Sequence, residues 1–408
     1  MNLKSKLPPR FKKYASFGVI PKLLLLPFAA AAVLGMKVLS PLVLIQIQKV
    51  HDWRIGHFTT DTELTRLSTI THNESSRRKI VKIYYFGSAT SSNQFLSEFW
   101  QRRLRSISGH WGWLLHKLSS RMTKINTTSF SSNIDSLGLL SHSSTPNFFL
   151  KHELQLGDKF INEFCENGKY ICLNVRDSKY LTQIRKRNSN DHDYRDSDIQ
   201  TYVAAAEALA DMGYTVFRMG AIVKEPLITK HPRVIDYATN GMRNEFLDIY
   251  LGAHCTFAVS VGSGWDGVPT IFRRPIIWVN HLPIFDPSGV THPHLIYPKI
   301  LLDSISAYQP KLLELIDRQI TDQFSTQAYM DAGVTIRDLS SEELVDAVTE
   351  MAARVEGTFI ETQEQIKMQA KLKHILSTHQ KLQPSPDYYP IRAKFASCFL
   401  SRYPNFLD

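Results

Sequence analysis

TFAVSVGSGWDGVPTIFRRPIIWVN, residues 256–280, contains two apolar runs joined by a turn rich in glycine and serine. The first run, residues 256–261, has the β-branched and small apolar side chains typical of a buried strand. The Gly-Ser-Gly turn at residues 262–264 then leads into a short amphipathic run. Where a strand turns into a helix, the first backbone N–H groups lack helical partners, and the helix dipole favours an anion there. The stretch therefore predicts either a phosphate-binding turn or a tight connection without a ligand, because so short a motif is weak.

Strand-like and helix-like runs alternate along the rest of the chain. The expected strands are 42–48, 80–86, 170–175, 214–218, 234–235, 256–261 and 275–279. The expected helices are 93–105, 148–165, 199–212, 246–251, 340–355 and 361–377. We expect a capping box at Ser197 and Gln200, and a helix that begins at Ser340 and ends at Gly357. The alternation predicts an α/β fold with doubly wound parallel sheets.

A length of 408 residues favours two domains over one. We place an N-terminal Rossmann-like domain at residues 37–166 and a C-terminal Rossmann-like domain at residues 167–380. A segment of residues 1–36 precedes them, and a Pro- and Tyr-rich tail of residues 381–408 follows without an assigned structure.

The net charge of +10 favours anionic partners, such as nucleotide diphosphates, nucleic acid or an acidic membrane surface. Outside the N-terminus the basic residues are spread along the chain without an aromatic-basic recognition motif, so we expect no nucleic-acid partner. The four cysteines form no C-x-x-C pair, which argues against a zinc finger or a disulfide framework and favours a reducing compartment. The sequence also lacks the P-loop, H-E-x-x-H and G-x-S-x-G motifs.

Residues 1–36 combine a basic start with an apolar run. Residues 1–22 contain six Lys or Arg and no acidic residue, and the uncharged run 23–36 follows. Fourteen residues are too few to cross a bilayer, which needs about 20. We expect the segment to lie on the anionic inner face of the cell membrane, which would make the protein cytoplasmic and peripheral. A signal peptide, or a helix packed on the protein's own core, are the alternatives.

The polar loop 49–57 follows the first expected strand. Ligands of open α/β sheets bind beyond the carboxyl ends of the strands, so this loop is a candidate site. His57 and Asp61 are candidate general bases, because imidazole and carboxylate accept protons near neutral pH. Arg54 is a candidate anion ligand, and Gly56 is expected to shape the loop that brings His57 forward. The alternative is a solvated loop whose His and Asp cap the next helix.

Two arginines, Arg176 and Arg218, stand where expected strands of the C-terminal domain end. A guanidinium offers paired donors to phosphate oxygens and stays charged. We therefore expect both to bind a diphosphate beside the 262–264 turn, the alternative being an ion pair with a neighbour such as Asp177. The neighbouring cleft candidates are Asp177 and Gly220.

Asp196-Ser197-Asp198 has the spacing of a D-x-D metal motif, because two carboxylates two residues apart can share one hard cation. The three residues also precede an expected helix, where Ser and Asp are favoured as caps. We interpret them as structural and expect no bound metal.

Several segments resemble a family of bacterial glycosyltransferases associated with surface-polysaccharide synthesis. They are RIGH (54–57), LNVRDSKYL (173–181), HDYRDSDIQTYVAA (192–205), FRMG (217–220), VIDYA (234–238), EFLDIYLGAHCTFAVSVGSG (245–264) and VNHLPI (279–284). The resemblance runs from about Lys37 to Val355. More distantly, the chain is similar to fucosyltransferase-like enzymes of the GT-B fold, in which an H-x-R motif places its Arg on the donor diphosphate. Arg176 matches that Arg, but Asn174 stands where the family has His.

The resemblance implies a GT-B fold, with two Rossmann-like domains facing a cleft. It implies that the donor nucleotide binds the C-terminal domain through Arg176, Arg218, Gly262, Ser263 and Gly264, and the acceptor the N-terminal domain. It also implies transfer without a metal or other cofactor, because positive side chains offset the charge of the leaving diphosphate.

The expected function is therefore transfer of a sugar from a nucleotide-diphosphate donor to a hydroxyl of a surface glycan or lipid-linked acceptor. One alternative is transfer of another group, such as pyruvyl, on the same fold. The other is a membrane-docked binding protein without turnover.

Overall fold

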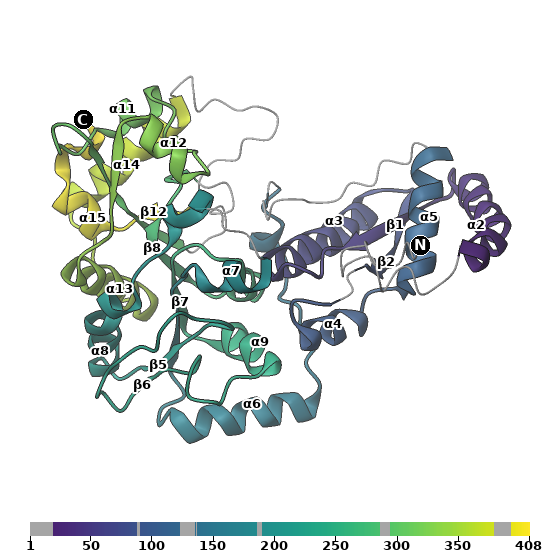
Figure 1. Ribbon diagram of the computed structural model, residues 1–408, viewed down its shortest axis with the longest axis horizontal. Helices are drawn as coiled ribbons and strands as arrows, with labels where there is room; N and C mark the ends of the chain where they lie inside the picture. The colour runs from purple at the N-terminus through teal and green to yellow at the C-terminus, as the bar shows by residue number, and fades with distance from the viewer. Residues whose placement is uncertain are drawn as a thin grey trace, which may run out of the picture. The chain divides into compact units, whose positions relative to one another are not determined.

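The computed structural model describes residues 19–87, 90–122, 135, 137–185, 190–285, 294–378 and 393–408. The chain divides into two compact units, Met1–Asn133 and Ile134–Asp408, called unit 1 and unit 2 below (Figure 1). The basic residues 4–13 of the expected membrane segment and residues 381–392 of the expected tail lie outside the described residues.

Unit 1 contains a parallel sheet of three strands in the order β1-β2-β3. Its elements are α2 (Val19–Leu39), β1 (Val43–Val50), the π-helix η2 (His57–Asp61), α3 (Thr62–Ser75), β2 (Lys79–Phe86), α4 (Gln94–Gln101), β3 (Ser106–Ile107) and α5 (Gly109–Met122). The expected strands 42–48 and 80–86 are confirmed. This sheet order runs in one direction, so within its described residues unit 1 does not have the doubly wound topology expected for residues 37–166.

Unit 2 contains a seven-stranded sheet in the order β12-β9-β8-β7-β4-β5-β6, and all its pairs are parallel. Its strands are β4 (Tyr170–Asn174), β5 (Thr215–Arg218), β6 (Val234–Ile235), β7 (Phe257–Ser260), β8 (Ile276–His281), β9 (His294–Pro298) and β12 (Lys394–Phe395). Its helices are α6 (Lys151–Phe164), α7 (Lys179–Arg185), α8 (Val203–Asp211), α9 (Glu245–His254), α10 (Gly267–Ile271), α11 (Leu312–Asp317), α12 (Thr326–Asp331), α13 (Ser341–Glu356), α14 (Gln363–Thr378) and α15 (Ser397–Arg402). A separate antiparallel pair joins β10 (Ile300–Asp303) to β11 (Val334–Arg337). Short 3-10 turns complete the unit at Leu139–His142, Asn190–Arg195, Ile199–Tyr202, Gly264–Asp266 and Pro404–Leu407.

The order of the large sheet has a reversal in its middle. Counted within unit 2, the strands run 3-2-1-4-5-6-7, so the winding changes direction between β4 and β7. Such a switch point is where doubly wound α/β proteins bind their ligands. Helices cover both faces of the sheet (Figure 1), and every residue of β4, β7 and β8 is buried. This explains why these strands are continuous apolar runs in the sequence. The doubly wound prediction is confirmed for this unit.

The boundary between the units falls before α6, whereas the sequence placed it near Asn167. Helix α6 packs against α9: Asp158 accepts a hydrogen bond of 2.8 Å from the hydroxyl of Tyr250. At Gly157, a Cβ atom would come within 2.1 Å of the same tyrosine ring. Helix α6 therefore belongs to unit 2 rather than forming a connector.

Of the two helix starts predicted from the sequence, the one at Ser340 is confirmed and the one at Ser197 is not. At α13, Ser340 and Glu343 form a capping box and Gly357 ends the helix in the left-handed conformation, as expected. The expected capping box at Ser197 is wrong. Asp198 is the N-cap instead, because its side chain accepts from the backbone N–H of Gln200 and opens a 3-10 turn before α8.

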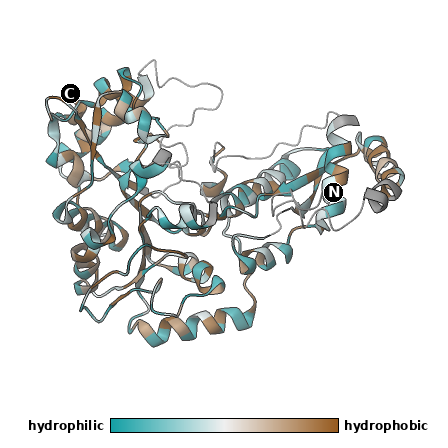
Figure 2. Ribbon diagram, in the orientation of Figure 1, coloured by the Kyte–Doolittle hydropathy of each residue, from teal (hydrophilic) through white to brown (hydrophobic). Residues whose placement is uncertain are grey.

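Helix α2 has one face buried in the protein and one face exposed to solvent. Ala29, Val33 and Met36 are buried in unit 1, so one face of the helix packs on the protein's own core. The outer face remains apolar (Figure 2): Phe28 is 68% exposed and Val38 71%. Among the described helices none is long and apolar enough to cross a membrane.

Candidate functional site

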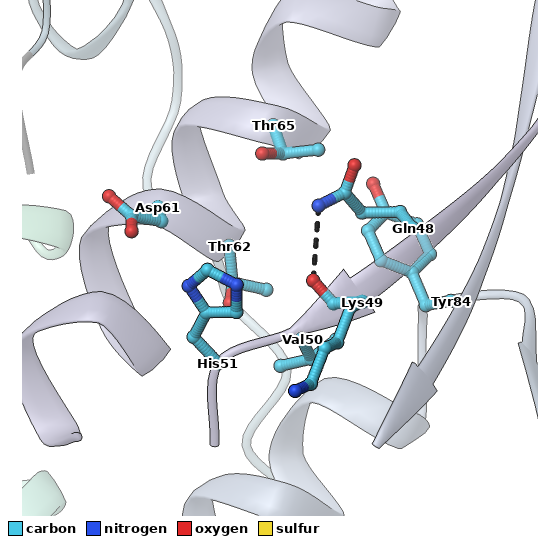
Figure 3. A pocket seen from close by; sticks show the side chains of 8 residues that line it. All are labelled: Gln48, Lys49, Val50, His51, Asp61, Thr62, Thr65 and Tyr84. Carbon is cyan, nitrogen blue, oxygen red and sulfur yellow. Dashed lines mark hydrogen bonds between the residues drawn. The ribbon is translucent and has the colours of Figure 1, made fainter. Parts of the chain in front are cut away.

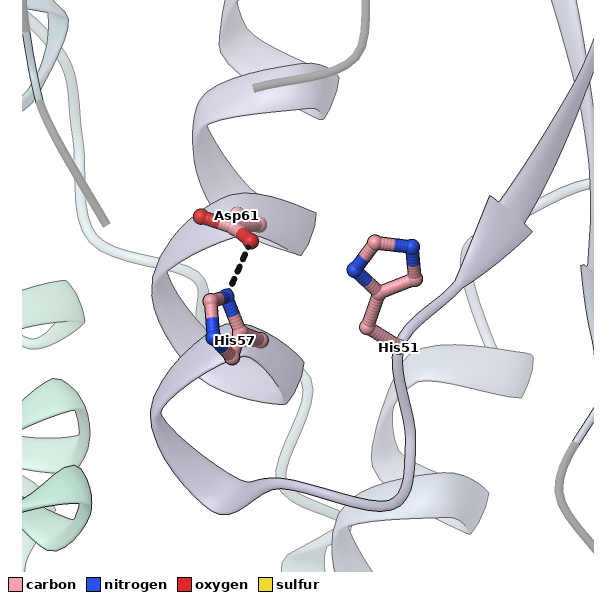
Figure 4. Close-up of side chains that lie close together, drawn as sticks. All are labelled: His51, His57 and Asp61. Atoms are coloured by element: carbon pink, nitrogen blue, oxygen red, sulfur yellow. Dashed lines mark hydrogen bonds and ion pairs between the residues drawn. The ribbon is translucent and has the colours of Figure 1, made fainter. Parts of the chain in front are cut away.

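His57 and Asp61 lie together in unit 1, one turn apart in the π-helix after β1 (Figure 4). Nδ1 of His57 is 2.7 Å from Oδ2 of Asp61, and a guanidinium nitrogen of Arg54 is 3.4 Å from Nε2. Because a guanidinium can only donate, Nε2 accepts and Nδ1 carries the proton shared with Asp61. The three residues thus hold the imidazole in one orientation and one tautomer, as general-base catalysis requires.

The local fold of this segment differs from the expected loop. The hydroxyl of Thr59 donates to the carbonyls of Ile55 and Gly56, at 2.8 and 2.9 Å, and the indole of Trp100 donates to the carbonyl of Phe58. These bonds hold a π-helical turn, a conformation often found at functional sites. Gly56 has φ −62° and ψ −50°, which any residue adopts, so the expectation that a glycine is needed to shape the loop is wrong.

His51 is a third member of this group, and the sequence analysis did not single it out. One ligand atom each of His51, His57 and Asp61 lies within 4.8 Å of the other two. A cavity of about 10 Å³ adjoins His51 and Asp61 (Figure 3). Burial lowers the pKa of His51 below its usual value, which keeps its imidazole neutral. The signal was present in the sequence, as a second histidine six positions before His57 in the loop 49–57.

In unit 2, the switch point of the sheet carries a network of hydrogen bonds. Nδ2 of Asn174, at the end of β4, is 2.5 Å from Oγ of Ser263 and 3.4 Å from Oγ of Ser260 at the end of β7. Asn174 and the 262–264 turn, which the sequence assigned to one site, are therefore in contact. Gly262 has φ +78°, and a Cβ atom there would lie 2.9 Å from a ring nitrogen of His281. Only glycine fits this position without strain.

The amides of the turn are less free than the sequence suggested. The backbone N–H of Ser263 donates to Asp266 at 3.0 Å, and the N–H of Trp265 donates to the hydroxyl of Ser263 at 3.2 Å. Asp266 is fully buried, and burial raises its pKa. The backbone donors of Ser263 and Trp265 are thus already paired within the turn.

Arg176 reaches the same region with Arg195. Its guanidinium pairs with Asp196 at 3.5 Å and donates to the carbonyl of His192 at 3.2 Å. Burial and then the charge of Arg195 lower the pKa of Arg176, so the two cations are close. Arg195 donates in turn to the carbonyl of Gly262. Arg195 was not among the predicted site residues, although it lies within the segment of residues 192–205 that carries part of the family resemblance.

Arg218, at the end of β5, is 99% buried and pairs with Asp236 at 3.1 Å. The ion-pair alternative thus holds for Arg218 with Asp236, and for Arg176 with Asp196. Arg218 also lines a groove of about 340 Å³ at the ends of β4 and β5. The other charged groups lining this groove are mostly acidic: Asp177, Asp196, Asp198, Lys224, Glu225 and Asp338.

Two further cleft candidates have structural partners. Asp177 accepts from the backbone N–H groups of Lys179 and Lys224, which ties two loops together. Gly220 has φ +153°, and a Cβ atom there would lie 2.4 Å from Val223, so the turn after β5 needs a glycine.

No model of a known protein family and no curated protein matches the chain. Among solved structures, the chain is similar to the ADP-heptose lipopolysaccharide heptosyltransferase II of E. coli, with 11% identity, a TM-score of 0.38 and coverage of 76% of this chain and 100% of that one. It is also similar to a family 9 glycosyl transferase from Veillonella parvula, with 9% identity, a TM-score of 0.41 and coverage of 77% and 97%. An E. coli heptosyltransferase solved with ADP-2-deoxy-2-fluoro heptose gives 13% identity, a TM-score of 0.25 and coverage of 70% and 73%. Similarities this low assign the chain to no family, and the architecture described above rests on its own sheets and helices.

Proposed function

We propose that the protein is a glycosyltransferase that moves a sugar from a nucleotide-diphosphate donor to a hydroxyl group. The observation that carries the proposal is the switch point between β4 and β7, where Arg176, Arg195 and the Gly262 turn come together. A parallel sheet of this order binds nucleotides at its carboxyl edge. Two neighbouring guanidiniums there would bind a diphosphate and offset the charge it develops as it leaves.

The donor would be held chiefly by Arg176 and Arg195, with the backbone of the Gly262–Gly264 turn beside it. Arg176 now pairs with Asp196, a carboxyl whose pKa burial raises to about 6. That carboxyl is a weak competitor for the guanidinium, because burial disfavours its charged form. Arg218 would not contact the diphosphate directly, because its guanidinium is paired with Asp236. It would contribute only its positive charge near the site.

The acceptor hydroxyl would be deprotonated by His57. A sugar hydroxyl is a poor nucleophile until its proton is removed, and a positioned base contributes typically 10²–10⁴-fold. Asp61 orients the ring and stabilises the imidazolium that forms, as the carboxylate of a catalytic triad does. We propose that transfer needs no metal, because the arginines supply the positive charge.

The place of action would be the cytoplasmic face of the cell membrane, on a glycan or lipid-linked acceptor. The basic residues 1–13 precede α2, and the outer face of α2 presents Phe28, Leu34 and Val38. A basic stretch beside an apolar face suits an anionic bilayer surface. The heptosyltransferase solved with an ADP-heptose analogue makes ADP-heptose one donor to test.

The test is a panel of UDP-, GDP-, ADP-, CMP- and dTDP-sugars in a thermal-shift assay. A donor at 100 times its Kd adds about 2.7 kcal/mol of stability. Arg176→Ala and Arg195→Ala should each weaken its binding by roughly 1.5–3 kcal/mol, the scale of a hydrogen bond to a charged group. Arg233→Ala is the matched control, because Arg233 is exposed and pairs with Glu166. If no nucleotide-sugar binds, or both site variants bind like the control, the donor site is wrong.

Two alternative functions are compatible with the same fold. One is transfer of a pyruvyl-type group, and the other is membrane-docked binding without turnover. Both are separated from glycosyl transfer by one measurement on a donor that binds. Release of the nucleoside diphosphate together with label transfer from the sugar identifies glycosyl transfer. Binding without release identifies a binding protein.

A further inference from the structure

Two imidazoles and one carboxylate converge in unit 1 beside the end of β1. His51, His57 and Asp61 are the group of three potential metal ligands found within the described part of the chain. His51 follows β1, whereas His57 and Asp61 come from the π-helix, so two separate elements bring the three side chains together (Figure 4). A spacing of four residues in a helix places His57 and Asp61 on one face, which is a common arrangement for metal ligands.

The His57–Asp61 pair already has nearly the spacing of two ligands on one ion. Nδ1 and Oδ2 are 2.7 Å apart. Neighbouring ligand atoms bonded to a metal at roughly 2.0–2.2 Å stand about 2.8–3.5 Å apart. A cation that takes the place of the proton shared by these two atoms therefore needs only a small opening of the pair, and the ring stays neutral because its proton moves to Nε2.

His51 supplies the third ligand after a modest movement. One of its ring nitrogens lies within 4.8 Å of a ligand atom of each of the other two residues, so the three side chains have to draw together to share one ion. A cavity of about 10 Å³ adjoins His51 and Asp61 but not His57, and Lys49, Thr62 and Thr65 also line it (Figure 3). That is close to the space of one water molecule, so a bound ion has room for a further oxygen ligand.

We propose that His51, His57 and Asp61 bind a divalent transition-metal ion, and that Zn²⁺ is the best match. Imidazole and carboxylate ligands suit Zn²⁺, whereas Mg²⁺ and Ca²⁺ prefer sites made of oxygen alone. Arg54 contacts the opposite nitrogen of His57, Nε2, and must turn away from it in the ion-bound form, because Nε2 then carries the proton and a guanidinium cannot accept it. The inference does not rest on glycosyl transfer, because it concerns binding by the free protein. The ion would replace the His57–Asp61 hydrogen bond that the proposed base uses, so we expect the ion-bound form not to transfer sugar.

The experiment is titration of the chelator-treated, full-length protein with ZnCl₂ by calorimetry, and with CoCl₂ by visible absorption. The expected result is one ion per chain, and no binding of Mg²⁺ or Ca²⁺ at the same concentration. His51→Ala, His57→Ala and Asp61→Asn should each weaken Zn²⁺ binding by at least about tenfold, the low end of what even the loss of an outer-shell partner costs. His72→Ala is the matched control, because His72 is an exposed histidine of the adjoining helix α3 and should leave binding unchanged.

Either of two results overturns the proposal: no stoichiometric Zn²⁺ binding to the wild type, or binding that survives in both His51→Ala and His57→Ala. Circular dichroism of each variant shows whether it has folded. If His57→Ala does not fold, His51→Ala still decides, because the hydrogen bond between His57 and Asp61 does not involve His51 and stays in place. The Zn²⁺ titration does not depend on the outcome of the nucleotide-sugar panel. The metal site and the donor site can therefore be refuted independently of each other.

Discussion

At the scale of single residues, the bond between His57 and Asp61 determines which ring nitrogen has the lone pair that can accept a proton. Asp61 accepts from Nδ1, so Nε2 is the basic atom. We predict that His57→Ala retains about a hundredth of the wild-type kcat or less, because a positioned general base contributes at least about 10²-fold. Asp61→Asn should also lower kcat, because an amide stabilises the imidazolium poorly. Donor Kd should stay unchanged in both variants; a His57→Ala enzyme with near-normal turnover would place the base elsewhere.

Asp196 gives a second prediction at this scale, in the pH dependence of stability. Burial raises the pKa of Asp196 to about 6, although the charge of Arg176 lowers it. A folded-state pKa above the ordinary value means that the folded protein binds the proton more tightly. Stability from this group is therefore present at low pH and is lost as pH rises from about 4 to about 6. We predict that Asp196→Asn removes that part of the pH dependence in urea unfolding. Parallel wild-type and variant curves between pH 4 and 6 would contradict the raised pKa.

At the scale of elements, the inner face of α2 packs in the core of unit 1, and we propose that its outer face contacts lipid. Val33 is fully buried, whereas Phe28, Leu34 and Val38 are exposed. We predict that the triple variant Phe28→Ser, Leu34→Ser, Val38→Ser keeps its unfolding midpoint but loses binding to vesicles that contain anionic lipid. Val33→Ser should instead lower the midpoint, because it places a hydroxyl in the core. Flotation with and without salt measures the vesicle binding. Equal flotation of the triple variant and the wild type would show that the outer face does not contact lipid.

Elements were also what the sequence predicted best. Strands β4, β7 and β8 were found because helices cover both faces of the sheet, which makes each strand a continuous apolar run. The π-helix was missed because it depends on the hydroxyl of Thr59 and the indole of Trp100, which is far away in the sequence. Arg195 and His51 were missed for a related reason. Nothing local indicates that one reaches the Gly262 carbonyl or that the other faces Asp61.

At the scale of the whole molecule, the two units have separate hydrophobic cores. Val33, Met36, Ile47 and Tyr85 form a core cluster in unit 1, and the cluster of unit 2 includes Val259. We predict two unfolding transitions in scanning calorimetry, with Val33→Ala lowering one and Val259→Ala the other. A nucleotide-sugar that binds should raise only the transition that Val259→Ala lowers. A single transition that both variants lower equally would show that the units unfold together.

The strand order of unit 2 also has a consequence for how the chain is made. Strand β4 occupies the centre of the sheet, yet one of its neighbours, β7, pairs Cys172 with Ala258 and Leu173 with Val259. At roughly 5–20 residues per second, a ribosome needs several seconds to produce the intervening residues. During that interval one edge of this buried strand has no partner, and closing so long a loop is slow. Nascent chains halted before residue 257 should therefore bind chaperones strongly, and chains extended past β8 should bind them less.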